Sequence, residues 1–297
     1  MMLRRLLTAA ALSALSLGSA QATVPLRPAA TFHLVLPAYV DGHGPYQFML
    51  DTGADNSGLY HWFTEQQGFK PGEVHDVGGQ TGTISVPSYH LASLAIDGRE
   101  IRDVEADDFP NRHDGEIEAG VAGNDLMDGT VVVFDFPCHS VSILPKPVDL
   151  KHLLTPHAHM VEGGPVTDGT QLTLPVQIGP AKGIAVLDTG SSDTRINPQF
   201  ARAAGIDPAS AAFYDAEKRF GVSDTPITSR KGPVGTVRFA GIELRNPEIR
   251  VIDLPVFSSF GFGDGPAMIL GLDLMQGHRL VYDHEAKRFW FDASTCR

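Results

Sequence analysis

The tetrapeptide Leu-Asp-Thr-Gly occurs twice in the chain, at Leu50–Gly53 and again 137 residues later at Leu187–Gly190. The leucine of each copy is the last residue of a short apolar run, Tyr46–Leu50 or Ile184–Leu187, of the kind found in buried strands. The tripeptide Asp-Thr-Gly is expected by chance about once in several thousand positions. Two copies in matching surroundings therefore indicate an internal repeat, and the chain is predicted to consist of two related halves.

A second match lies further along each half. The segment Val121–Met127 corresponds to Ile269–Met275, and both contain an apolar pair followed by glycine. Their offset is 148 residues instead of 137, so the second half is expected to carry about eleven extra residues between the two matches. Insertions of this kind belong in surface loops.

The rest of the sequence consists mostly of short β-prone runs separated by Gly and Pro, which predicts an all-β architecture with a few short helices. One helix is expected to start at Asn197, with Asn as the N-cap and Pro198 as the first helical residue. A stretch rich in proline and histidine between the halves is expected to be a linker. The predicted organisation is a signal peptide at 1–22, an N-terminal lobe at 23–147, a linker at 148–169 and a C-terminal lobe at 170–297.

The first 22 residues have the layout of a cleavable secretory signal. Arg4 and Arg5 precede an apolar run at Leu6–Leu17, and small residues lead up to Ala22. Export to the periplasm or the medium is therefore expected, with a retained N-terminal anchor as the alternative. No later segment approaches the roughly 18 apolar residues of a membrane span, so no stable membrane insertion is expected after cleavage.

The composition is that of a folded, acidic protein. Hydrophobic residues make up 42% of the chain, which is enough for a substantial core. The formal net charge of −12 leaves no basic patch, so binding to nucleic acid is not expected. Cys138 and Cys296 can pair in an oxidising compartment, but two buried free thiols fit the sequence equally well.

The residue types in the repeated tetrapeptide suit acid–base chemistry. An aspartate at the end of a buried strand projects its carboxyl group into the space between two lobes, and the nearby glycine permits a tight turn. Two carboxylates brought together by symmetry cannot both ionise cheaply, so Asp51 and Asp188 are expected to share one proton. Such a pair can deprotonate a bound water that attacks a carbonyl carbon, while donating a proton to the carbonyl oxygen.

With these motifs the sequence resembles the pepsin and retropepsin-like aspartic peptidases, and more closely the bacterial members in which two retropepsin-like halves are fused. The resemblance extends over residues 30–293 or so. It implies a bilobal acid-protease fold with two pseudo-symmetric, barrel-like β lobes. It also implies an aspartic endopeptidase, with a peptide or protein substrate in the cleft between the lobes and Asp51 and Asp188 as the catalytic pair. The supporting residues that it implies are Thr52, Gly53, Thr189, Gly190 and Ser191.

Some features depart from the family pattern. Ala54 cannot supply the hydroxyl group that a serine gives pepsin-like enzymes at this position, whereas Ser191 can. The flap over the substrate is expected near residues 77–89, but no aromatic residue stands where a pepsin-type flap would need one. Because one chain encodes both halves, the pair is expected to form within a monomer.

Other interpretations remain open beside the peptidase. A periplasmic binding or assembly module could keep the same fold without turnover. Each Asp-Thr-Gly could be only a turn with an Asx-type cap, although the duplication disfavours this. Asp125 and Asp273 also repeat, and we expect them to cap turns behind the aspartate loops. Neither a metal nor a cofactor is expected, because the linker histidines lack the spacing of a zinc site. These histidines are His152, His157 and His159.

Overall fold

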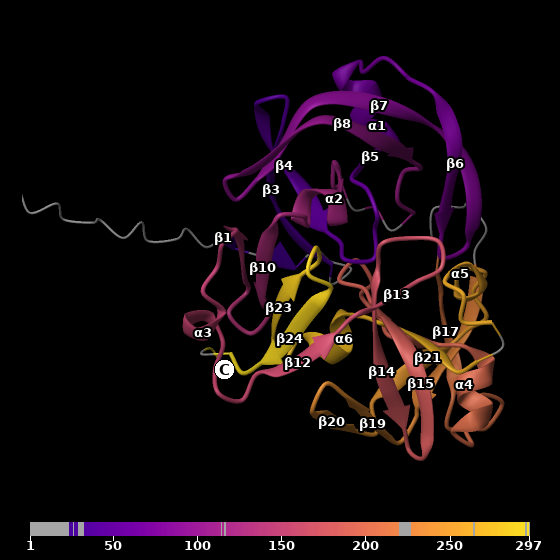
Figure 1. Ribbon diagram of the computed structural model, residues 1–297. Helices are drawn as coiled ribbons and strands as arrows, with labels where there is room; N and C mark the ends of the chain where they lie inside the picture. The colour runs from indigo at the N-terminus through magenta and orange to yellow at the C-terminus, as the bar shows by residue number, and fades with distance from the viewer. Residues whose placement is uncertain are drawn as a thin grey trace, which may run out of the picture.

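In the computed structural model the chain forms two β-rich halves that share a third sheet (Figure 1). The structure describes residues 24–25, 27–28, 33–113, 115, 117–219, 227–263, 265–294 and 296. The predicted signal peptide at 1–22 lies outside the described residues. The prediction of an all-β, bilobal fold is confirmed.

The first half is built on an eight-stranded sheet in which β3 also pairs with β7. Its strands, in spatial order, are β2 (Arg27–Pro28), β3 (Leu34–Val40), β4 (His43–Leu50), β9 (Gly120–Ala122), β5 (Gly58–Tyr60), β8 (Arg99–Phe109), β7 (Gly82–Ile96) and β6 (Val74–Gly79).

The second half repeats this arrangement in a ten-stranded sheet, in which β13 (Gly164–Pro165) pairs with β14 beside the main path. The strands of the path, in spatial order, are β17 (Tyr214–Arg219), β18 (Ile227–Pro233), β21 (Glu248–Val251), β16 (Arg195–Ile196), β22 (Ala267–Leu270), β15 (Ala181–Leu187), β14 (Leu172–Ile178), β19 (Thr236–Phe239) and β20 (Ile242–Arg245).

A six-stranded sheet joins the halves, because β10 of the first half pairs antiparallel with β23 of the second. The predicted linker contributes β12 to this sheet and also contains α3 (Leu150–Leu153). A disulfide links Cys138 to Cys296, so the chain is closed from its middle to its C-terminal end. The strands, in spatial order, are β1 (Val24–Pro25), β11 (Ser140–Pro145), β10 (Thr130–Asp135), β23 (Arg279–Asp283), β24 (Arg288–Asp292) and β12 (His159–Glu162).

The helices are short, and those that follow the aspartate loops and those that follow Gly123 and Gly271 occur at equivalent places in the two halves. Asn197 caps α4 (Pro198–Ala203) by accepting a hydrogen bond from the Phe200 N–H, with Pro198 in the first turn, which confirms the predicted helix start. Gly68 and Gly205 follow the corresponding helices with φ of 68° and 69°, a conformation that favours glycine. The remaining helices are α1 (His61–Gln67), α2 (Asn124–Met127), α5 (Val256–Ser259) and α6 (Leu272–Met275). No helix in the described part of the chain is long and apolar enough to cross a membrane.

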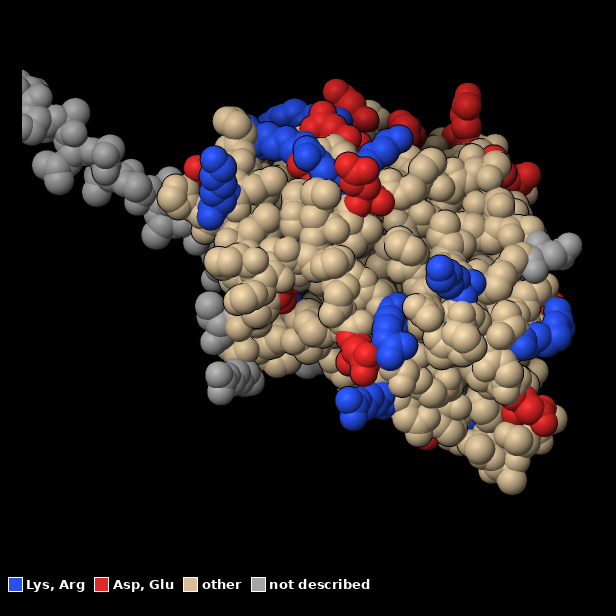
Figure 2. All heavy atoms as spheres, turned by 60° about the horizontal axis from the view of Figure 1, so that its bottom comes forward, with Lys and Arg blue, Asp and Glu red and all other residues tan. Residues whose placement is uncertain are grey.

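One apolar core runs through both halves and the shared sheet. Phe48 and Leu59 from the first half, Leu174 and Val237 from the second, and Tyr282 from the shared sheet belong to the same buried cluster. This continuous packing holds the two aspartate loops in a fixed relation to each other. On the surface, Lys and Arg side chains are interspersed with Asp and Glu over the face seen in Figure 2.

Candidate active site

Each aspartate lies directly beyond the end of a central strand. β4 pairs in parallel with β9, and β15 pairs in parallel with β22. The Asp51 N–H donates to the Ala122 carbonyl at 2.9 Å, and the Asp188 N–H donates to the Leu270 carbonyl at 3.1 Å. The two repeated motifs in each half therefore meet, and together they fix where the aspartate leaves the sheet.

A glycine after each parallel neighbour allows the chain to pass close behind the aspartate loop. A Cβ atom on Gly123 would lie 2.7 Å from the backbone of Asn56, and one on Gly271 would lie 2.7 Å from the backbone of Asp193. Both distances are too short for a real side chain. Glycine is thus required at both places by the close approach of two backbone segments.

Two threonines lock the aspartate loops together across the interface between the halves. The Thr52 hydroxyl donates to the Leu187 carbonyl at 2.9 Å and accepts from the Thr189 N–H at 3.0 Å. The Thr189 hydroxyl does the same in reverse, with the Leu50 carbonyl at 2.8 Å and the Thr52 N–H at 3.0 Å. Both threonines are buried, so these four bonds are shielded from water and hold the loops in register.

The two carboxyl groups converge on the space beside Gly53. A Cβ atom built on this glycine would lie 2.8 Å from Asp188 Oδ1 and 3.0 Å from Asp51 Oδ1. Asp51 Oδ1 also accepts hydrogen bonds from the Gly53 N–H at 2.7 Å and the Gly190 N–H at 3.1 Å. Backbone from both halves therefore holds the Asp51 carboxylate against that of Asp188.

A comparison with protein families bears directly on this arrangement. The model of the aspartyl protease family matches residues 36–126 and 174–274, one segment in each half. The chain belongs to the aspartyl protease family. A search of curated proteins found no match. The two matched segments confirm the resemblance to a protein with two fused retropepsin-like halves, and each contains one of the Asp-Thr-Gly loops.

The pKa of each carboxyl group in this protease fold is raised, but not equally. Burial raises the pKa of Asp51, while the Gly53 and Gly190 N–H groups oppose the shift by stabilising the charged form. Burial, and then the negative charge of Asp51, raise the pKa of Asp188 well above its ordinary value, against the opposing charge of Arg195. Because the two carboxyl groups interact, they titrate as a pair that can hold one proton between them.

The tip of the β6–β7 hairpin contacts the pair of carboxyl groups through Asp188. The Gln80 side-chain amide donates to Asp188 Oδ2 at 3.1 Å, although Gln80 belongs to the first half and Asp188 to the second. The tip of this hairpin falls within the predicted flap region, residues 77–89. The sequence offered no signal that a glutamine would make the contact, because the residue lies in a glycine-rich turn.

Ser191 lies in the second aspartate loop, but its hydroxyl donates to the Asp193 carbonyl at 3.3 Å. The repeated acidic residues behind the loops accept hydrogen bonds from hydroxyl groups: Asp125 from Ser57 at 2.8 Å and Asp273 from Thr194 at 2.6 Å. Asp125 and Asp273 thus brace the loops from behind, the place expected of turn caps.

Asn124 also supports the first aspartate loop, although the sequence did not predict this role. Its side-chain amide donates to the Thr52 carbonyl at 3.3 Å, and its amide oxygen accepts from the Tyr282 hydroxyl at 2.9 Å. The second half has Leu272 at the equivalent place. The mismatch of polar and apolar residues within the repeat was the available signal.

The start of the second half is also tied to the first aspartate loop. Asp55 Oδ1 accepts from the N–H and the hydroxyl of Thr170, at 2.5 and 2.6 Å. The ring nitrogens of His284 lie 2.7 Å from the Thr170 carbonyl oxygen and 2.6 Å from Asp128 Oδ1. The loop that carries Asp51 is therefore anchored through Asp55 to Thr170 at the start of the second half, and Thr170 in turn contacts His284, which follows β23 of the shared sheet.

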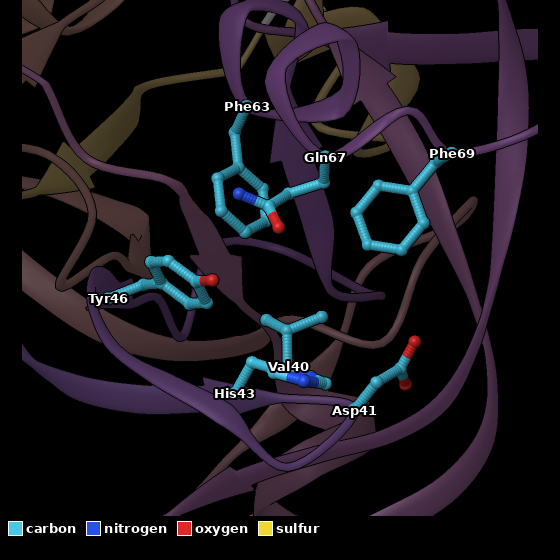
Figure 3. Close-up of a pocket in the computed structure, with 7 residues that line it drawn as sticks. All are labelled: Val40, Asp41, His43, Tyr46, Phe63, Gln67 and Phe69. Atoms are coloured by element: carbon cyan, nitrogen blue, oxygen red, sulfur yellow. The ribbon is translucent and has the colours of Figure 1, made fainter.

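A separate cavity of about 210 Å³ lies in the first half, between the β3–β4 hairpin and α1 (Figure 3). The rings of Tyr46 and Phe63 meet edge to face in its wall, with centroids 4.6 Å apart. β4 runs from this wall to Asp51, and five extended residues span about 16 Å. The cavity is thus distinct from the candidate active site. Its lining residues are Val40, Asp41, His43, Tyr46, Phe63, Gln67 and Phe69.

The linker histidines are spread over different elements: His152 lies in α3 and His159 in β12. Within the described residues, no group of three or more His, Cys, Asp or Glu side chains is arranged to hold a metal ion.

Proposed function

We propose that this protein is an aspartic endopeptidase in which Asp51 and Asp188 activate water for the hydrolysis of peptide bonds. The observation that carries this proposal is the pair itself: two buried carboxyl groups, one from each half, converge beside Gly53, and the pKa of each is raised. The substrate would be a peptide or protein bound in the cleft between the halves, where the pair lies. No cofactor takes part in the proposed reaction.

The unequal pair suggests which carboxyl group does what. Ionised Asp51 would take a proton from a water molecule as the water oxygen attacks the peptide carbonyl carbon. Neutral Asp188 would donate its proton to the carbonyl oxygen, which gives a tetrahedral gem-diol. Breakdown of this intermediate breaks the C–N bond, with a proton going to the amine, and releases a carboxylic acid and an amine. Activity requires one proton on the pair, so it should fall as pH rises through the raised pKa of Asp188.

The proposal is tested by combining a transition-state mimic with aspartate variants. A statine-type inhibitor should block the cleavage of a proteome-derived peptide library by the purified protein. Asp51→Asn and Asp188→Asn should each lower kcat by about 1,000-fold or more, and the double variant should be little worse, because the residues act as a unit. Asp103→Asn is the matched control, since the Asp103 side chain is 88% exposed. Folded wild-type protein that cleaves no peptide in the library would favour the rival binding module.

We infer further that the protein is exported and works as a monomer outside the cytoplasm. The Cys138–Cys296 disulfide supports this inference, because such bonds persist in oxidising compartments. Cell fractionation and the intact mass of the mature protein test it. A mass that matches a chain starting at Thr23 would support signal cleavage, whereas a full-length, membrane-associated chain would support the retained anchor.

A further inference from the structure

The Gln80–Asp188 hydrogen bond joins an exposed hairpin to a buried carboxyl group of the candidate active site. β6 pairs with β7 out to Gly79 and Gly82, so Gln80 and Thr81 form the tip of the hairpin. We call residues 74–86 the flap. It extends from the first half toward the second (Figure 1), and Val74 in it is 67% exposed. Asp188 is only 6% exposed.

The group that the flap places on Asp188 is a carboxamide, the same functional group as a peptide bond. Its N–H donates to Asp188 Oδ2, which therefore acts as a hydrogen-bond acceptor. Asp188 Oδ1 is buried and has no hydrogen-bond donor among the described residues, while it lies close to Asp51. The two oxygens thus face different partners: Oδ1 faces Asp51 and Oδ2 faces the flap.

A substrate must reach the same oxygen that Gln80 occupies. The peptide carbonyl and the attacking water both have to contact the pair, and Oδ2 is the oxygen of Asp188 that faces the flap side. We propose that Gln80 is a pseudo-substrate latch: its carboxamide holds the flap closed on Asp188 and must be displaced before a peptide can bind. This inference deepens the proposed function and rests on it for the identity of the displaced substrate.

The latch should weaken the binding of any ligand that contacts the pair. If only a fraction of molecules is unlatched, the apparent dissociation constant of any ligand of the pair is raised by the reciprocal of that fraction. Removing the Gln80 carboxamide should therefore tighten ligand binding. A residue that assists the reaction would give the opposite pattern, because its loss would lower kcat.

The first arm of the test does not require turnover. Hydrogen exchange of flap amides should be about tenfold faster in Gln80→Ala than in wild type, since one hydrogen bond to a buried acceptor closes the flap. Asp188→Ala removes the acceptor and should speed flap exchange by a similar factor, and the double variant should add nothing. Thr83→Ala, at an exposed position on the same hairpin, is the control and should match wild type. Equal exchange in Gln80→Ala and wild type would overturn the latch.

The second arm uses the statine-type inhibitor and a peptide substrate. Gln80→Ala should lower the inhibitor dissociation constant and KM by about three- to tenfold, with kcat within twofold of wild type. A fall in kcat with KM unchanged would instead make Gln80 a positioning residue in the reaction and would overturn the latch. If neither wild type nor the variant binds the inhibitor, the proposed function fails, while the exchange measurement still decides whether Gln80 holds the flap.

Discussion

The two aspartate loops share one backbone design but hold their carboxyl groups by different means. In both loops an N–H three residues on donates back to the aspartate carbonyl, from Ala54 to Asp51 at 3.3 Å and from Ser191 to Asp188 at 3.4 Å. Beyond this framework the loops differ. Asp51 is held by two backbone N–H groups, whereas the side chain of Gln80 donates to Asp188.

A symmetric fold can therefore hold an asymmetric pair of carboxyl groups. The repeated backbone brings the carboxyl groups together, and this would give two equivalent acids. The two N–H groups on Asp51 favour its charged form, and the resulting negative charge helps to raise the pKa of Asp188. The position of the two carboxyl groups comes from the repeat, and the difference between their surroundings comes from the departures from it.

The largest effect is expected where one loop presses on the carboxyl group of the other. A Cβ atom on Gly190 would lie 2.1 Å from Asp51 Oδ2, and one on Gly53 would lie 2.7 Å from the Asp188 carboxyl carbon. Gly190→Ala should therefore displace Asp51 and lower kcat/KM by about 100-fold or more. Gly53→Ala should lower it less, because its contact is less severe. Peptidase assays with circular dichroism as the folding check measure both.

The matched control for these variants is Gly277→Ala, an exposed position outside the flap, because a Cβ atom there would meet nothing within 4 Å. It should keep near-wild-type kcat/KM. Activity in Gly190→Ala and Gly53→Ala equal to that of Gly277→Ala would show that neither glycine is needed to hold the carboxyl group of the other loop.

The next largest effect is expected on stability, at Asn124, which occupies the position of the repeat equivalent to Leu272. Asn124→Leu makes the first loop resemble the second, and it leaves the Tyr282 hydroxyl and the Thr52 carbonyl without their partner. The free energy of unfolding should fall by about 1–3 kcal/mol. Denaturant titration measures this loss. Adding Tyr282→Phe removes the stranded hydroxyl and should recover part of it, so a double variant less stable than Asn124→Leu would contradict the account.

The sequence was sufficient to predict the parts of the molecule that repeat. The two copies of Asp-Thr-Gly, and the glycines at 123 and 271, predicted two β halves whose loops meet, because a repeated motif with repeated surroundings implies a repeated backbone. The aspartyl protease match and the paired sheets confirm this organisation. Thr52 and Thr189 could be expected at the interface for the same reason.

The parts that do not repeat could not be predicted in this way. Gln80 reaches Asp188 across 108 residues of sequence, and the bond depends on how the flap folds over the other half. The direction of the Ser191 hydroxyl depends on one rotatable bond, and it donates to the nearby Asp193 carbonyl. The linker supplied β12, since an edge of the shared sheet was open to any extended segment that passed it.

A smaller effect is expected on stability, where the unequal pair should show as a gain. A carboxyl group whose pKa is raised on folding makes the folded state more favourable at low pH, and this contribution is lost as pH rises through the folded pKa. Asp188→Asn removes the cost of burying a charge and should raise the free energy of unfolding by about 1–2 kcal/mol at pH 7. The gain should vanish below the ordinary aspartate pKa of about 3.9.

Asp51→Asn should gain less, because the Gly53 and Gly190 N–H groups already compensate the charge of Asp51. Thermal unfolding of wild type and both variants at pH 3 and pH 7 measures these gains in the free energy of unfolding. Equal gains at pH 7 would mean that the two carboxyl groups have the same environment, and the comparison drawn between the loops would be wrong.

The smallest expected effect is none. If the pair forms within one chain, mixing inactive Asp51→Asn protein with inactive Asp188→Asn protein should restore no activity, since every molecule lacks one carboxyl group. The β10–β23 pairing and the four threonine bonds tie the halves together within the chain, so exchange of halves between molecules would require both to be broken. A peptidase assay of the mixture, incubated for hours at high concentration, makes the comparison with each variant alone. Substantial recovery would show that halves trade partners, and the pair would then belong to a domain-swapped dimer.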